Sequence, residues 1–207
     1  MAKRAYQNLY PSVTTVLSLL NNYGLNEWFK RTSYAEILTE SNKGKKIGGE
    51  IHTVIQSYIK NGSAKIETTD TIEVSNALKS FMLFKKENPE IVLKKSEVEK
   101  TSDRYLFNGT IDALAEIGVQ TVLLDWKSGK CGTKDKPPIY DSYKTQCSAY
   151  CHLMGLDRAI IVSVAKDAVA YDKYEMGGEE IKGEFEEVFL PLLRIWIHKN
   201  RNKKRKD

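Results

Sequence analysis

The spacing of apolar residues changes once along the chain. Over about residues 10–90 they recur every three to four positions, which is the periodicity of amphipathic helices. Ser12 is suited to cap the first of these helices, and Asn61-Gly62 is suited to end the third. The pattern predicts four helices, at about 12–24, 26–39, 45–61 and 71–87.

From about residue 91, apolar and polar residues alternate as they do in half-buried strands. Strands are expected at 91–99, 105–117, 119–126 and 158–165, with 169–176 as a candidate fifth strand. Two further helices are expected at 141–154 and 180–199. Because proline lacks an N–H, Pro191 should kink the second of them.

This order of elements is typical of an α/β fold, in which helices flank a central mixed sheet. A chain of 207 residues has room for one sizeable core. We therefore expect a single domain over 1–198 with an N-terminal helical region at about 10–90. The expected core covers about 91–176, a C-terminal helix covers about 180–198, and a basic tail covers 199–207.

The composition, with 41% hydrophobic and 29% charged residues, is ordinary for a globular protein. No apolar run approaches the roughly 20 residues that span a bilayer. The first residues also lack the apolar segment of a secretory signal. A cytoplasmic protein without a membrane partner is therefore expected, in the host cytoplasm if a phage encodes it.

The net charge of +5 suits a polyanionic partner such as DNA without requiring one. Part of the excess lies in the tail at 199–207, which reads equally well as a solubilising terminus or as a contact with phosphates. The three cysteines argue against a disulfide framework. They are also one thiolate short of a Cys₄ set, so no Fe–S cluster is expected.

The stretch from 107 to 129 carries the most informative chemistry. A two-residue turn at Gly118-Val119 would pair Asp112 with Asp125 across a hairpin, with their Cβ atoms roughly 5 Å apart. Lys127 follows Asp125 by two positions, so its side chain should leave the same face. The opposite face of this hairpin is expected to be apolar, pairing Ile111 with Trp126, Ala113 with Leu124, and Ala115 with Val122.

Two facing carboxylates repel each other unless a cation lies between them. Mg²⁺ or Mn²⁺ would relieve the repulsion, because hard cations prefer carboxylate oxygens. Such an ion acidifies a bound water and neutralises phosphate charge, and Lys127 could orient that water or stabilise the transition state. Taken alone, the pattern fits a surface aspartate pair with an ordinary lysine salt bridge equally well.

Several segments resemble one known family. Gly109-Thr-Ile-Asp112 and Leu124-Asp125-Trp-Lys127 resemble the core motif of the PD-(D/E)xK nuclease superfamily, in its RecB-like and phage-type exonuclease branch. Further segments also resemble the family, and they occur along the chain in the family's order. They are Tyr10-Pro-Ser-Val-Thr-Thr-Val-Leu, Gly48-Gly-Glu-Ile-His52 and Ser96-Glu-Val-Glu99 before the core motif, and Gln146-Cys-Ser-Ala-Tyr150 after it. The resemblance spans about residues 10–165 and implies a restriction-endonuclease-like core.

The resemblance also implies roles for individual residues. The implied metal ligands are His52, Asp112, Asp125 and the backbone carbonyl of Trp126. The implied catalytic residues are Asp112, Asp125, Lys127 and Glu97. Glu99 points the same way as Glu97, so spacing does not choose between them. The implied contacts with nucleic acid are Gln146 and Tyr150, and Ser128, which follows Lys127, could donate a hydrogen bond to a phosphate. Nitrogen ligation by His52 slightly favours Mn²⁺ over Mg²⁺.

The function expected from these features is a metal-dependent DNA exonuclease. It would act at single-stranded or duplex ends in recombination, repair or phage replication, with replication or recombination proteins as candidate partners. An endonuclease on the same fold is the first alternative, although sequence-specific readers usually carry an added recognition element. A non-catalytic nucleic-acid-binding module is the second, and it predicts loss of Asp112, Asp125 or Lys127, all of which are present.

Overall fold

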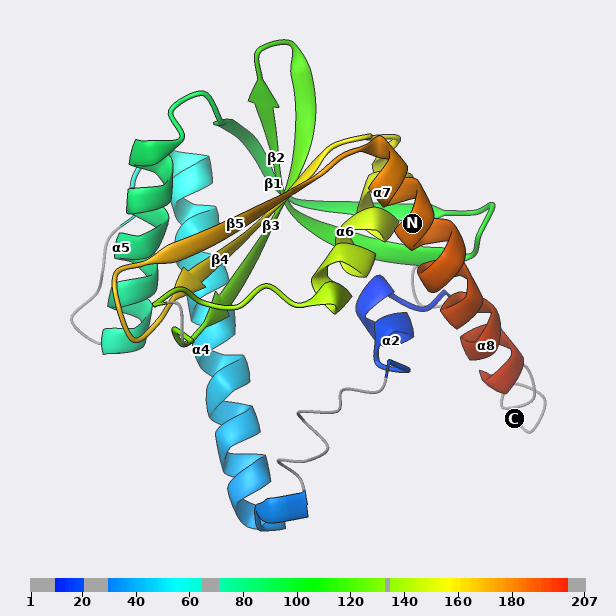
Figure 1. Ribbon diagram of the computed structural model, residues 1–207, viewed down its shortest axis with the longest axis horizontal. Coiled ribbons are helices and arrows are strands. Elements are labelled where there is room, and N and C mark those ends of the chain that lie inside the picture. The colour runs from blue at the N-terminus through cyan, green and yellow to red at the C-terminus, as the bar shows by residue number, and fades with distance from the viewer. Residues whose placement is uncertain (1–9, 21–29, 65–70, 133–134, 201–207) are drawn as a thin grey trace, which may run out of the picture.

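The computed structural model describes residues 10–20, 30–64, 71–132 and 135–200, arranged around one five-stranded sheet (Figure 1). The strands, which follow one another across the sheet in chain order, are β1 (Val92–Ser102), β2 (Phe107–Ile117), β3 (Gln120–Gly129), β4 (Ala159–Ala165) and β5 (Tyr171–Met176). The helical segments are α2 (Val13–Leu17), α4 (Tyr34–Asn61), α5 (Ile72–Glu87), α6 (Asp141–Met154), α7 (Gly178–Gly183), the π-helical η1 (Glu184–Phe189) and α8 (Leu190–Asn200). Among these described strands β3 and β4 pair in parallel and the other neighbours pair antiparallel, so the sheet is mixed.

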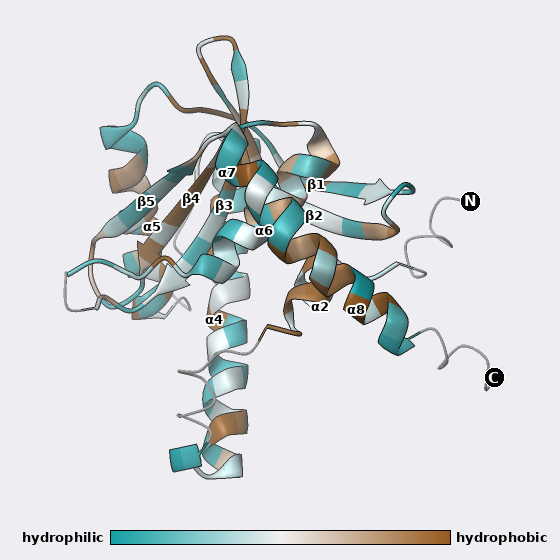
Figure 2. Ribbon diagram, turned by 45° about the vertical axis from the view of Figure 1, so that its right-hand side comes forward, coloured by the Kyte–Doolittle hydropathy of each residue, from teal (hydrophilic) through white to brown (hydrophobic). Residues whose placement is uncertain are grey.

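Helices cover both faces of the sheet (Figures 1 and 2). Buried side chains of α4 and α5 pack against one face, where Trp126 of β3 contacts Phe81 and Phe84 edge-on. Buried side chains of α2, α6, α7, η1 and α8 pack against the other face, around Phe107 and Phe189. The expected α/β fold with a helix-flanked mixed sheet is confirmed. None of the helices in the described ranges is long and apolar enough to cross a membrane.

Helix α4 corrects the prediction of two separate helices at 26–39 and 45–61. It runs unbroken through Gly44, starting after a capping box in which Ser33 and Glu36 satisfy each other's backbone N–H groups. A glycine inside a helix costs only about 1 kcal/mol relative to alanine, so Gly44 does not break it. As predicted, the helix ends at Gly62, which adopts the left-handed conformation with a φ of 71°. Residues 21–29, which include parts of the predicted helices at 12–24 and 26–39, lie outside the described ranges.

The turn between β2 and β3 sets the register that the sequence predicts. Gly118 has a φ of 60°, and Ile117 pairs with Gln120 as a two-residue turn requires. The antiparallel pairing continues to Ala113 and Leu124, one step before the two aspartates. The predicted pair of Asp112 and Asp125 is thus not among the paired positions of this ladder, while Asp125 pairs in parallel with Ile161 of β4.

The prediction of which β2 residues share the apolar face of Trp126 is wrong for Ile111. Ile111 packs with Phe107 on the α6 face of the sheet and not beside Trp126 on the α4 face. The neighbouring strand β1 is irregular here, with a shift of register after Leu93 and a positive φ of 53° at Glu97. Irregularities of this kind bend a strand and increase its twist, which breaks strict alternation.

The C-terminal segment also departs from the predicted single helix at 180–199. It begins at Gly178, passes through the π-helical η1, and continues as α8 to Asn200. In η1 the N–H of Leu190 donates to the carbonyl of Phe185, five residues earlier. Because Pro191 has no N–H to continue the α-helical pattern, the irregular turn lies directly before it. This wider turn lies where the kink was expected.

Candidate active site

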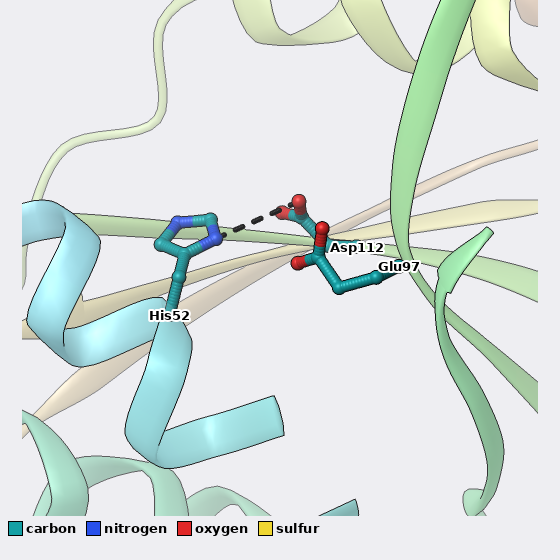
Figure 3. Close-up of side chains that lie close together, drawn as sticks. All are labelled: His52, Glu97 and Asp112. Carbon is teal, nitrogen blue, oxygen red and sulfur yellow. Dashed lines mark ion pairs between the residues drawn. The ribbon is translucent and has the colours of Figure 1, made fainter. Parts of the chain in front are cut away.

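Three side chains from different elements converge beside strands β1 and β2. His52 from α4, Glu97 from β1 and Asp112 from β2 each place a ligand atom within 4.8 Å of the other two (Figure 3). One imidazole nitrogen and two carboxylate oxygens suit Mn²⁺ or Mg²⁺, with the nitrogen favouring Mn²⁺. The donor set present in the chain therefore fits the metal that the sequence resemblance implies.

Glu97 is the acidic residue of β1 that joins this cluster, a choice that spacing left open against Glu99. Its φ of 53° is a conformation that costs a non-glycine residue about 1–3 kcal/mol. Glu99 instead takes a regular place in the ladder opposite Thr110. The neighbours of Glu97, Ser96 and Val98, pair with Ala113 and Ile111, so Glu97 lies across from Asp112 on β2.

Asp112 is held in place by two neighbours. Its Oδ2 accepts a hydrogen bond of 2.9 Å from the backbone N–H of Trp126, and its Oδ1 lies 3.6 Å from Nδ1 of His52. Burial alone would raise the pKa of Asp112, but His52, Lys127 and the Trp126 N–H lower it overall. Burial alone would lower the pKa of His52, but the contact with Asp112 raises it overall. Asp112 is therefore held ionised, and a cation bound at this point would displace the proton that His52 tends to hold.

Asp125 and Lys127 form a buried ion pair beside the cluster. The Asp125 side chain has no exposed surface, and its Oδ2 lies 2.5 Å from Nζ of Lys127. Burial raises the pKa of Asp125 to about 6, although Lys127 opposes this shift. Burial alone would lower the pKa of Lys127, but Asp125 and Asp112 raise it overall, so the amino group stays charged.

The predicted ligand set differs from this arrangement in two of its acidic residues. Asp125 does not belong to the cluster of His52, Glu97 and Asp112, because its two oxygens face Lys127 and Gln146. Glu97, predicted as catalytic, lies in the cluster instead. Metal ligation by Asp125 and by the Trp126 carbonyl remains a prediction.

Gln146 and Tyr150 support Asp125 from helix α6. The Gln146 amide donates to Oδ1 of Asp125 at 3.3 Å and to the Tyr150 hydroxyl at 3.1 Å. Tyr150 is only 4% exposed, and a Cβ on Gly109 would lie 2.5 Å from its ring. A ring enclosed in this way braces the site and has almost no surface for the nucleic-acid contact that was expected of it.

Ser128 and Trp126 are placed by the end of β3. Ser128 is partly exposed beside helix α4, where its Oγ would lie 3.9 Å from a Cβ on Gly48. Trp126 is 2% exposed and is fixed by its edge-on contacts with Phe81 and Phe84. Its rigid packing holds the N–H that orients Asp112.

Two tyrosines beside the site were missed by the sequence analysis. Nζ of Lys127 lies 5.1 Å from the centre of the Tyr143 ring, and the Tyr140 ring packs on Tyr143 at 5.3 Å with planes 76° apart. The available signal was the position of Tyr143, three residues before Gln146 and so on the same helix face.

Two exonucleases are among the solved structures to which the chain is similar, at low sequence identity. No protein-family model matches the chain, and no curated protein matches its sequence. The alkaline exonuclease of Laribacter hongkongensis in complex with dAMP is 13% identical, with a TM-score of 0.43 over 98% of this chain and 96% of that one. A phage-related exonuclease from Haemophilus somnus 129PT is 12% identical, with a TM-score of 0.42 over 96% of this chain and 99% of that one.

Proposed function

We propose that this protein is a divalent-metal-dependent nuclease of the PD-(D/E)xK type that hydrolyses DNA from strand ends. The observation that carries the proposal is the cluster of His52, Glu97 and Asp112 directly beside the buried pair of Asp125 and Lys127. A cation site next to a permanently charged lysine is a combination that suits phosphodiester hydrolysis.

His52, Glu97 and Asp112 would hold Mg²⁺ or Mn²⁺, with Asp125 and the Trp126 carbonyl as additional candidate ligands. When bound, such an ion supplies charge neutralisation at the phosphate and lowers the pKa of a coordinated water. The low pKa of Asp112 suits this role, because its carboxylate is ionised at neutral pH and ready to bind a cation.

The remaining residues orient these groups. Lys127 would stabilise negative charge on the phosphate or orient the attacking water, because its amino group stays protonated. The Trp126 N–H fixes the Asp112 carboxylate, and the Gln146 amide fixes that of Asp125. Partly exposed Ser128 and Gln146 are candidates to donate hydrogen bonds to phosphate oxygens.

Action at strand ends is favoured over sequence-specific internal cleavage. The strands and helices of the described ranges form the sheet and its two covering layers. Few of the described residues are therefore left to form an added recognition element. We propose a role in recombination, repair or phage replication, alongside replication or recombination proteins.

The test is digestion of labelled DNA by the purified protein. Linear single-stranded, linear duplex and closed circular DNA are incubated with Mn²⁺, with Mg²⁺ or with EDTA. The proposal expects metal-dependent release of mononucleotides or short oligomers from linear DNA and no cutting of circles. Asp112→Asn should be inactive, while Asp103→Asn, which changes an exposed aspartate at the tip of the β1–β2 hairpin, should be active. Cutting of circles would favour an endonuclease, and binding without cleavage would favour a non-catalytic module.

A further inference from the structure

Two tyrosine rings connect the candidate site with the surface of the molecule. Tyr143, in the first turn of α6, lies against Lys127, and Tyr140 lies against Tyr143. Tyr143 is partly buried, and burial raises the pKa of its hydroxyl, so the ring is a neutral wall of the site. Tyr140 is 52% exposed, which makes it the outer of the two rings.

The backbone holds Tyr140 firmly even though its ring is exposed. Tyr140 is the N-cap residue of α6 in an extended conformation, and its carbonyl accepts a 2.9 Å hydrogen bond from the N–H of Tyr143. Two prolines, Pro137 and Pro138, precede it and restrict the approach of the chain. The backbone that carries the ring is therefore constrained, so little backbone conformational entropy would be lost if a ligand packed on the ring.

An exposed aromatic residue alone needs no functional explanation. Tyr140 differs from Tyr34, which is 75% exposed at the start of α4, because only one ring separates Tyr140 from Lys127. A nucleobase is likewise separated from its phosphate by one sugar. The carboxylate next to Tyr140, that of Asp141, lies 3.4 Å from Nζ of Lys144, which offsets part of its charge.

We propose that the Tyr140 ring stacks on the terminal nucleobase of the DNA strand whose phosphate lies at the cluster of His52, Glu97 and Asp112. This inference rests on the proposed nuclease function and names how that site holds its substrate. Stacking on an aromatic ring tolerates every base, because each base has a π face, and so it suits an enzyme that degrades DNA without reading its sequence.

The experiment compares three single-stranded oligonucleotides of the same length. One is unmodified, one has an abasic site as its 5′-terminal nucleotide, and one has an abasic site as its 3′-terminal nucleotide. Initial rates with Mn²⁺ give kcat/KM for the wild-type chain, Tyr140→Ala and Tyr140→Phe, with Tyr34→Ala as the matched control. The wild-type chain should prefer the end that carries a base by about tenfold, the size expected of one stacked base. Tyr140→Ala should lose that preference, while Tyr140→Phe and Tyr34→Ala should keep it.

The outcomes separate this inference from the function on which it rests. If the wild-type chain degrades all three oligonucleotides at equal rates, the stacking role of Tyr140 is wrong and the nuclease function stands. The same holds if Tyr140→Ala retains the wild-type preference. If the wild-type chain degrades no DNA with either metal, the proposed function fails and the inference fails with it.

Discussion

Nζ of Lys127 lies 2.5 Å from Oδ2 of Asp125, a carboxylate with no exposed surface. Two residues of one strand thus place a buried negative charge and its neutralising partner beside a cluster of metal-binding side chains. Removing one member of such a pair leaves an uncompensated buried charge, which is costly for folding as well as for chemistry.

The first prediction concerns this ion pair. Lys127→Ala should abolish DNA cleavage while Mn²⁺ and DNA binding are retained, because the lysine contributes charge at the phosphate. It should also lower the free energy of unfolding by about 3–5 kcal/mol at pH 7.5, since Asp125 is left buried and unpaired. Denaturant unfolding and single-turnover cleavage measure the two effects. Adding Asp125→Asn should restore most of the stability and none of the activity, and a Lys127→Ala variant that cleaves at a near wild-type rate would remove Lys127 from the mechanism.

The second prediction concerns His52 as a ligand. His52→Ala should weaken Mn²⁺ binding by at least about tenfold and reduce the preference for Mn²⁺ over Mg²⁺, because the nitrogen donor is lost. Calorimetric titration measures both affinities. The matched control is His198→Ala, which changes an exposed histidine near the end of α8. Unchanged Mn²⁺ affinity in His52→Ala would exclude His52 from the ligand set.

The third prediction concerns pH. Burial raises the pKa of Asp125 to about 6, and the contact with Asp112 outweighs burial and raises the pKa of His52. Both groups take up protons as the pH falls, and a cation binds best when those protons are released. Mn²⁺ affinity should therefore fall between pH 7.5 and pH 5.5, by up to about tenfold per pH unit for each proton displaced. Calorimetry in two buffers with different ionisation enthalpies counts these protons, and equal affinity at both pH values would contradict this account.

The fourth prediction concerns two glycines with opposite surroundings. A Cβ at Gly109 would lie 2.5 Å from the Tyr150 ring, whereas a Cβ at Gly44 inside α4 would meet nothing within 4 Å. Gly109→Ala should lower the free energy of unfolding by about 1–3 kcal/mol and slow cleavage, because Tyr150 and Gln146 must move. Gly44→Ala should raise it by about 0.5–1 kcal/mol, as expected for a helix interior. Thermal and denaturant unfolding compare the two, and equal effects would mean that Tyr150 is free to shift.

The local features of this fold were predictable because neighbouring residues determine them. Gly118 fixed the turn and hence the register of β2 and β3, and the bounds of α6 followed from apolar spacing. The prediction wrongly divided helix α4 in two near Gly44. A glycine is only a weak local signal, and the cap and packing of α4 stabilise the helix through it.

The geometry of the site was less predictable, because it depends on contacts between distant segments. Glu97 joins the cluster because the pairing of β1 with β2 places it across from Asp112, and the spacing within β1 does not reveal that pairing. The orientation of Asp125 towards Lys127 and Gln146 depends on how α6 packs on the sheet. The Tyr140 and Tyr143 pair has no motif of its own in the sequence.

A crystal of the protein soaked with Mn²⁺ and a short single-stranded oligonucleotide tests the central claim most directly. Anomalous scattering from manganese would locate the ion without reference to the protein. The account predicts a peak in direct contact with His52, Glu97 and Asp112, with a phosphate of the oligonucleotide between that peak and Lys127. No peak at this position under excess Mn²⁺, or a phosphate bound elsewhere, would contradict it.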